Sequence, residues 1–319
     1  MRNVLLLCFF LLSLSSVGQP VKDHGHLKIG GGKLLDESGK PVVLRGMSYG
    51  WHCLWPRFYN AGSVDWLVKD WGVTVVRAAL GVELGKDSYL KRPDWSREKI
   101  VAVVEEAIRM NVYVIIDWHS HNIQLEEAKA FFRDMATRFG KNPHVIYEIF
   151  NEPDYESWKE VKDYSIEVIK VIREIDPDNI IIVGSPHWDQ DVQLPADDPI
   201  TGYDNLIYSL HYYAATHNQP LRDRADYALS KGLPLFISES AAVEATGDGP
   251  LNVAEWQKWI DWAEKHQLSW ITWSISDKEE TCSVLLPTAS SEGAWKDDQM
   301  RESGIRAREM IRKLNNWKQ

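Results

Sequence analysis

Two glutamates, Glu152 and Glu239, are the residues of this sequence best placed to carry out chemistry. Each closes a short apolar run, at residues 145–152 and 234–239. A carboxylate at the end of a buried strand is costly unless it has a partner. Two such groups in different environments can divide the roles of proton donor and nucleophile, as in the cleavage of glycosidic bonds. The alternative is a structural ion pair between Arg77 and one of the two glutamates.

Polar and aromatic side chains follow the other apolar runs in the same way. They are Arg77, Asp117, Trp118, His119, Asn151, His187, Trp188, His211, Tyr213, Trp273 and Asp277. Scattered surface residues would not fall at matching ends of apolar runs. The carboxyl ends of parallel strands meet at one end of a barrel, so these side chains are expected to form one site there.

Eight apolar runs that alternate with helix-forming segments must position this site. The runs are residues 42–48, 73–80, 112–119, 145–152, 180–185, 206–212, 234–239 and 269–276. Several are continuously apolar, which is typical of parallel strands buried on both faces. Eight such units predict an α/β fold, a (β/α)8 TIM barrel. A doubly wound open sheet is the alternative, but no glycine-rich phosphate turn follows the first run.

The segments before the first unit have separate roles. Residues 27–40 contain the turn-like sequence Glu37-Ser-Gly-Lys40, which predicts an N-terminal β-hairpin plug over one mouth of the barrel. Residues 1–18 combine Arg2, an apolar run and small residues before Gly18. This pattern predicts a secretory signal peptide cleaved near Gly18-Gln19, with a buried N-terminal helix as the alternative. Residues 19–319 would then form a single catalytic domain in the extracellular space or the periplasm.

The composition limits the partners. The chain has 319 residues and a formal net charge of −10, which argues against nucleic acid as the main partner. No segment after the signal peptide is apolar for long enough to cross a membrane, and nothing indicates an oligomer, so we expect a monomer. Fifteen tryptophans suit both cores and stacking surfaces. Cys53 and Cys282 follow the first and last runs, and both a disulfide and two free thiols remain open.

The order of the motifs is more specific than any one of them. They are Val42-Val-Leu-Arg-Gly-Met-Ser48, Val75-Val-Arg-Ala-Ala79, Val114-Ile-Ile-Asp-Trp-His119, Ile149-Phe-Asn-Glu-Pro153, Ser209-Leu-His-Tyr-Tyr213, Phe236-Ile-Ser-Glu239 and Trp273-Ser-Ile-Ser-Asp-Lys278. Together they cover about residues 27–300. In this order the sequence resembles the retaining glycosidases of clan A, and in detail the endo-β-1,4-glucanase (cellulase) branch of glycoside hydrolase family 5.

The resemblance implies a double displacement that cuts internal bonds of cellulose and related β-glucans, without a cofactor or a metal. It makes Glu152 the general acid/base and Glu239 the nucleophile. The supporting roles it implies are Asn151 on the sugar 2-hydroxyl, Arg77 keeping Glu239 ionised, Tyr213 donating to Glu239, His211 near Glu152, and His119 in the same subsite. Further substrate-binding residues would be Trp273 as the stacking floor, Trp55, Trp188, Lys278, Glu280 and, in a loop that departs from the family pattern, His52.

Three other functions remain open at this point. A β-mannanase, a xyloglucanase or a mixed-linkage glucanase would share the same catalytic residues. A metal-dependent barrel hydrolase would use His119-Ser-His121 together with His187, His211 and Asp277, which are metal-ligand types. A sugar-binding protein without activity is disfavoured because both glutamates are present.

Overall fold

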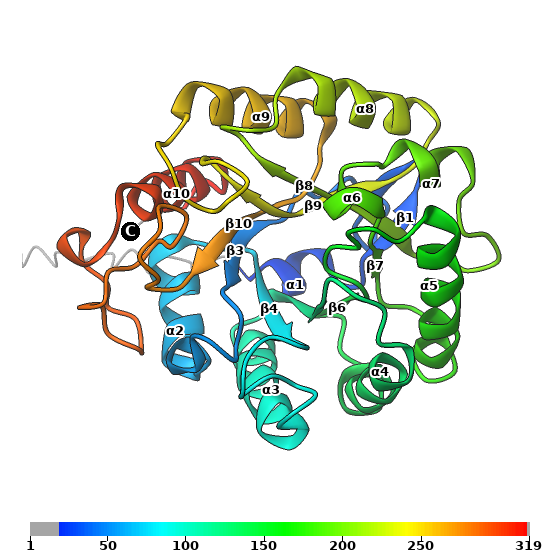
Figure 1. Ribbon diagram of the computed structural model, residues 1–319, viewed down its shortest axis with the longest axis horizontal. Coiled ribbons are helices and arrows are strands. Elements are labelled where there is room, and N and C mark those ends of the chain that lie inside the picture. Colours follow the sequence, from blue (N-terminus) through cyan, green and yellow to red (C-terminus); the bar gives the residue numbers. More distant parts are fainter. Residues whose placement is uncertain (1–18, 318–319) are drawn as a thin grey trace, which may run out of the picture.

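Eight parallel strands close into a barrel, in the order β10-β3-β4-β5-β6-β7-β8-β9 (Figure 1). The computed structural model describes residues 19–317, so the predicted signal peptide lies outside the described residues. The strands are β3 (Arg45–Tyr49), β4 (Val75–Gly81), β5 (Tyr113–His119), β6 (Val145–Glu148), β7 (Ile181–Val183), β8 (Leu206–Tyr213), β9 (Leu235–Ala241) and β10 (Trp270–Ile275). The predicted (β/α)8 barrel is confirmed, and each strand falls on one of the eight apolar runs.

Helices surround the barrel and cover its outer face. The longer ones are α3 (Pro93–Arg109), α4 (Leu125–Phe139), α5 (Trp158–Arg173), α8 (Gln219–Ser230), α9 (Val253–His266) and α10 (Glu302–Leu314). The first unit has the short α2 (Ala61–Trp66), which continues into a π-helical turn (Leu67–Trp71), and the unit after β7 has only α6 (Pro186–Asp189) and α7 (Gln193–Asp197). Within residues 19–317, no helix is both long enough and apolar enough to cross a membrane.

Local sequence accounts for the ends and faces of these helices. Ser157 and Glu160 form a capping box at the start of α5, in which each side chain bonds the other's backbone N–H. In α4, Ala128, Phe131 and Phe132 recur at helical spacing and are all fully buried against the barrel. The amphipathic pattern therefore decides which side of each helix faces the strands.

An N-terminal hairpin closes the barrel at the amino ends of its strands. It follows α1 (Pro20–His24) and pairs β1 (Lys28–Gly30) with β2 (Lys33–Leu35) in antiparallel register. Leu27 and Leu34 pack with inward-facing strand residues in one apolar cluster. The plug is confirmed, and it leaves the carboxyl ends of the strands free for the site.

The turn of this hairpin differs from the prediction. It lies at Gly31-Gly32, where both residues have positive φ, and not at residues 37–40. Two consecutive glycines supply the left-handed backbone that a two-residue hairpin turn needs. Residues 36–40 form a separate turn, in which the carboxylate of Asp36 accepts hydrogen bonds from the Lys40 amide and the Ser38 hydroxyl. An antiparallel bridge between Leu35 and Pro41 spans this second turn, so the predicted turn is real, but it follows the hairpin of β1 and β2 and does not join them.

Candidate active site

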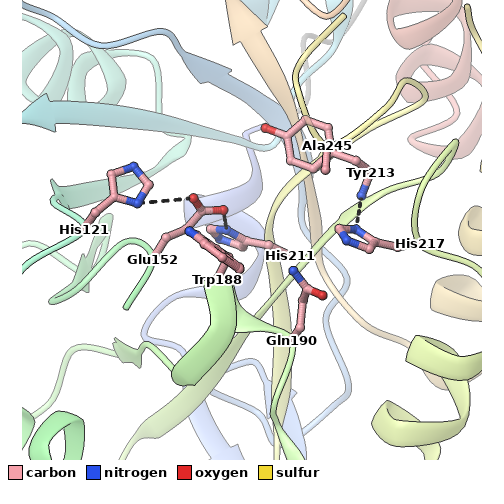
Figure 2. Close-up of a pocket in the computed structure, with 8 residues that line it drawn as sticks. All are labelled: His121, Glu152, Trp188, Gln190, His211, Tyr213, His217 and Ala245. Atoms are coloured by element: carbon pink, nitrogen blue, oxygen red, sulfur yellow. Dashed lines mark hydrogen bonds and ion pairs between the residues drawn. The ribbon is translucent and has the colours of Figure 1, made fainter. Parts of the chain in front are cut away.

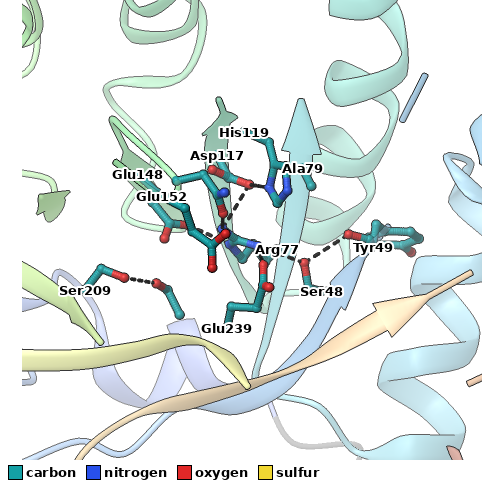
Figure 3. A network of polar contacts seen from close by, with 12 residues as sticks. Ser48, Tyr49, Arg77, Ala79, Asp117, His119, Glu148, Glu152, Ser209 and Glu239 are labelled. Carbon is teal, nitrogen blue, oxygen red and sulfur yellow. Dashed lines mark hydrogen bonds and ion pairs between the residues drawn. The ribbon is translucent and has the colours of Figure 1, made fainter. Parts of the chain in front are cut away.

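Five of the polar residues predicted at the strand ends meet at the carboxyl end of the barrel: Arg77, Asp117, His119, Glu152 and Glu239 (Figure 3). Glu239 lies on β9, opposite His211 of β8 in the parallel register. Glu152 follows β6, and its backbone N–H bonds the carbonyl oxygen of Ser120 in the loop after β5. One carboxylate oxygen each of Glu152 and Glu239 and one ring nitrogen of His211 all lie within 4.8 Å of one another. Two carboxyl groups and an imidazole thus surround one small volume.

Arg77 organises the floor of the site. Its fully buried guanidinium contacts Glu239 Oε2 at 3.0 Å, Glu148 Oε2 at 2.6 Å and Asp117 Oδ2 at 3.1 Å. Burial disfavours the cation, but the three carboxylates outweigh it and raise the pKa of Arg77 well above its usual value. Arg77 also donates to Asn151 Oδ1 at 2.6 Å. The amide nitrogen of Asn151 is buried and has no hydrogen-bond partner within residues 19–317.

Glu239 and Glu152 have different partners. Tyr213 donates its phenolic hydrogen to Glu239 Oε1 at 2.6 Å. Glu152 Oε1 lies 2.8 Å from His211 Nδ1, and its Oε2 lies 3.7 Å from His121 Nδ1. One glutamate therefore faces a guanidinium and a phenol, and the other faces two imidazoles.

The pKa values of Glu152 and Glu239 shift in the directions opposite to those expected from the sequence. Burial raises the pKa of Glu239 and the charge of Glu152 adds to this, against His211, Arg77 and Tyr213. Burial also raises the pKa of Glu152, but the hydrogen bond and charge of His211 outweigh it and lower that pKa below its usual value. The sequence argument expected Arg77 to decide the order by keeping Glu239 ionised. In the structure, which of the two glutamates has the lower pKa depends on how much positive charge His211 carries.

A cleft in two parts runs across the glutamates. One part has a volume of about 510 Å³, and Trp188, Gln190 and His217 line it (Figure 2). The other has a volume of about 310 Å³, and its lining includes the predicted substrate-binding residues Trp55, Trp273, Lys278 and Glu280. Four residues line both parts: His121, Glu152, Tyr213 and Ala245. The cleft therefore continues on both sides of Glu152, with aromatic rings on each side.

The aromatic residues beside Glu239 are held firmly. The rings of Trp273 and His119 stack at 5.1 Å between centroids and 11° between planes. His119 is fixed from the other side by a 2.7 Å contact between its Nδ1 and Asp117 Oδ2. Burial lowers the pKa of His119 well below its usual value, so this imidazole is neutral. Both rings line the part of the cleft that contains Glu239.

The structure separates His52 from the other predicted substrate-binding residues. Its side chain is fully buried, and its Nδ1 accepts a hydrogen bond from the Gly81 amide at 2.9 Å. Burial lowers its pKa to about 3, so it stays neutral. His52 joins the loop after β3 to the end of β4 and lines neither part of the cleft. One ring nitrogen of His52 is thus used within the fold and the other is buried, so the structure does not bring His52 into the cleft.

The residues considered for a metal site are dispersed. His187 pairs with Asp191, Asp277 pairs with Arg57, and His119 is held by Asp117. Among residues 19–317, the one group with converging ligand atoms is Glu152, His211 and Glu239. The guanidinium of Arg77 already neutralises Glu239 there, and His211 is bonded to Glu152. We therefore assign these three as a hydrogen-bonded site and not as metal ligands.

Cys53 and Cys282 are both buried free thiols. Their sulfur atoms face different surroundings, Cys53 beside Gly81 and Cys282 beside Gly247. The disulfide left open by the sequence is not formed. Burial raises the pKa of Cys53 to about 11 and that of Cys282 well above its usual value.

These thiols give a direct prediction for a chain that begins at Gln19. Since the thiolate is the reactive form, neither cysteine should react with Ellman's reagent until the protein is unfolded, when both should react. Dithiothreitol should leave the melting temperature unchanged. A melting temperature that falls with the reductant would instead reveal a bridge.

Several residues of the site were missed from the sequence. Glu148, which binds Arg77, and Asp189, which lies beneath His211, were not singled out, and Asp117 was expected at the site but not as a partner of Arg77. His121 was noted only as part of a metal motif, yet it faces Glu152. A charged residue within an apolar run is a usable signal for Glu148 and Asp117, because such a residue needs a buried partner. No comparable signal marks Asp189.

Comparisons with known proteins agree with this geometry. Residues 35–279 match the family described as Cellulase (glycosyl hydrolase family 5). The chain is 41% identical over 302 residues to an endoglucanase from Clostridium saccharobutylicum, covering 92% of this chain and 67% of that protein. It is 41% identical over 309 residues to endoglucanase N from Pectobacterium atrosepticum, covering 94% and 69%.

Solved structures give the same result. A protein from Cytophaga hutchinsonii superposes with a TM-score of 0.91 at 41% identity, covering 93% of this chain and 97% of that one. The catalytic domain of a Thermobifida fusca endoglucanase, in complex with cellotetraose, superposes with a TM-score of 0.87 at 31% identity, covering 92% and 100%. The similarity thus extends over nearly all of this chain.

Proposed function

This chain belongs to glycosyl hydrolase family 5, and we propose that it is a secreted endo-β-1,4-glucanase that cleaves internal bonds of β-glucans with retention of configuration. Its assignment as a glycoside hydrolase follows from the family and from its endoglucanase relatives. The finer parts of the proposal are the stereochemistry, the substrate and the location.

The observation that carries the mechanism is the closeness of two carboxylates with unlike partners. An oxygen of Glu152 lies within 4.8 Å of an oxygen of Glu239. Retaining enzymes place the two carboxyl groups about 5–5.5 Å apart, whereas inverting enzymes leave about 6.5–9.5 Å for a water molecule. The short separation supports a direct attack by one carboxylate on the sugar.

The partners then divide the roles. Glu239, held by Arg77 and Tyr213, attacks the anomeric carbon. Glu152 gives its proton to the leaving glycosidic oxygen, and later removes a proton from the water that hydrolyses the glycosyl–Glu239 ester. The unpartnered amide nitrogen of Asn151 is available to the sugar 2-hydroxyl. When the ester forms, the charge on Glu239 disappears, which favours the ionised form of Glu152 needed for the second step.

The cleft supports a polymeric substrate. Trp188 on one side and Trp55 and Trp273 on the other offer aromatic faces on which pyranose rings can stack. The Thermobifida fusca relative was solved with cellotetraose, a β-1,4-linked glucan oligomer. A β-glucan chain that lies through both parts of the cleft would place an internal bond beside Glu152. The signal-like residues 1–18 support the export of the protein.

One assay series tests the proposal. The purified chain from Gln19 onward is incubated with carboxymethyl cellulose, lichenan and glucomannan, each with and without EDTA, and proton NMR follows the first anomer released from cello-oligosaccharides. We expect reducing ends from carboxymethyl cellulose, no effect of EDTA, and the β-anomer first. The α-anomer first would contradict retention, loss of activity with EDTA would favour the metal-dependent alternative, and cleavage of glucomannan alone would indicate a mannanase.

A further inference from the structure

Beneath His211, on the side away from Glu152, lies a buried carboxyl group that the mechanism above does not use. His211 Nε2 lies 3.0 Å from the Ser238 hydroxyl, 3.4 Å from Asp189 Oδ2 and 3.8 Å from Glu148 Oε1. Asp189 is fully buried, and its Oδ1 accepts the Ser185 amide at 2.5 Å. Within residues 19–317 its Oδ2 makes no hydrogen bond, and it lies against the imidazole of His211.

The backbone around Asp189 is shaped to bring this carboxyl inward. His187, Trp188 and Asp189 have φ of 56°, 54° and 58°, three consecutive non-glycine residues in the left-handed region. Backbone in this region persists only where the surroundings enforce it, and it is concentrated at functional sites. Here the Trp188 amide donates to the carbonyl of Pro153, directly after Glu152. One turn therefore places Trp188 in the cleft and Asp189 under His211.

Asp189 and His211 compete for one proton. Burial raises the pKa of Asp189 to about 8, with His211 acting against it. Burial likewise disfavours the imidazolium of His211, but the carboxylates around it, Asp189 first among them, raise its pKa. Two ionisable groups in such close contact titrate as a pair. With the proton on Asp189, His211 is neutral, and with the proton on His211, a positive charge faces Glu152.

We propose that Asp189 is a positioning residue for the acid/base, which acts by controlling how much positive charge His211 presents to Glu152. An imidazolium at 2.8 Å favours the ionised form of Glu152, which cannot donate a proton to a leaving group. A neutral His211 with its proton on Nδ1 keeps the hydrogen bond and removes that penalty. By sharing a proton with His211, Asp189 sets the charge that faces Glu152, and so the pH above which Glu152 no longer holds the proton that the proposed function requires; the inference rests on that function.

The other charged groups near His211 do not offer this exchange. Glu148 from β6 is tied to Arg77 of β4 through a 2.6 Å contact, and its pKa is lowered to about 2. Glu239 from β9 is held by Arg77 and Tyr213. The imidazoles of His119 and His217 act on His211 only through their charge, and burial lowers the pKa of each. Asp189 is the buried carboxyl at His211 that Arg77 does not engage.

The test is the pH dependence of kcat for Asp189→Asn on cellotetraose or a longer cello-oligosaccharide. The amide keeps the shape but cannot hold the proton or balance an imidazolium, so His211 should stay neutral and Glu152 should keep its proton to higher pH. We expect the alkaline limb of the profile to move up by about 1 pH unit, with little change in KM. Asp189→Ser, which removes the same carboxyl and leaves room for a water, should move the limb in the same direction.

A matched control and a second substrate separate this role from a structural one. Asp191→Asn removes a carboxylate of the same loop that pairs with Arg224 and not with His211, and it should leave the limb in place. A dinitrophenyl cellobioside, whose leaving group needs no proton, should show no shift in its glycosylation rate with either Asp189 variant. An unmoved limb, the same shift with both substrates, or loss of folding in both variants would overturn the inference. Absence of any glycan hydrolysis by the unaltered protein would instead contradict the proposed function.

Discussion

Replacement of Glu239 by glutamine is expected to lower kcat on carboxymethyl cellulose by about 10⁴-fold or more, because an amide cannot form the glycosyl ester. The change keeps the size of the side chain and its place beside Arg77 and Tyr213. The fold and the affinity for cello-oligosaccharides should therefore survive. Reducing-sugar release measures the first quantity, and calorimetric titration with cellotetraose measures the second.

Glu244→Gln is the matched control for this variant. Glu244 is an exposed glutamate in the loop after β9, five residues from Glu239, and it lines neither part of the cleft. Its replacement should leave kcat within about twofold of the unaltered protein, as for most surface substitutions. If Glu239→Gln kept more than a few per cent of the activity while the control was normal, Glu239 could not be the nucleophile.

Replacement of Arg77 by methionine is expected to have the largest effect on stability. Its guanidinium contacts Asp117, Glu148 and Glu239, and the first two of these carboxylates are completely buried. Removal of one partner from a buried ion pair costs about 3–5 kcal/mol, because the remaining charge has no compensation. Urea denaturation followed by tryptophan fluorescence would measure the change in the free energy of unfolding, and activity should also be lost.

Two comparisons show whether the loss comes from the buried network. Arg77→Lys keeps the charge but lacks the planar fork that reaches several carboxylates, so it should lie between the unaltered protein and the methionine variant. Arg57→Met breaks a partly exposed pair with Asp277 and should cost less than about 1 kcal/mol. Equal destabilisation by Arg57→Met and Arg77→Met would mean that the buried network contributes no more to the free energy of unfolding than a partly exposed ion pair does.

The fold was largely predictable because its main signal is local. Parallel strands buried on both faces appear as continuous apolar runs, and each of the eight predicted runs overlaps one strand of the barrel. The turn of the N-terminal hairpin was misplaced because two turn-forming segments, Gly31-Gly32 and residues 36–40, lie close together. The chain pairs in antiparallel fashion across both segments, and nothing in either sequence shows which one joins the two longer strands.

Site residues that lie on or just after the strands could be predicted from the sequence. Those positioned by unusual backbone conformations could not. Glu239, His211 and Tyr213 lie in the carboxyl halves of their strands, Glu152 follows β6, and Arg77 lies within β4, and the barrel brings all five together. His52 also follows a strand, but its ring turns inward to bond the Gly81 amide, a choice that depends on packing. Asp189 was missed because His, Trp and Asp in succession give no indication of three left-handed residues. The relative acidity of the two glutamates was misjudged because the second partner of His211 was unknown.

The cleft that continues on both sides of Glu152 also bears on the physical behaviour of a glucan solution. A polymer lying through both parts would be cut far from its ends, so each event would divide a long chain into two shorter ones. Viscosity depends steeply on chain length, whereas sugar release counts only the number of cuts. We therefore expect the viscosity of a carboxymethyl cellulose solution to fall steeply while its reducing-sugar content has hardly risen.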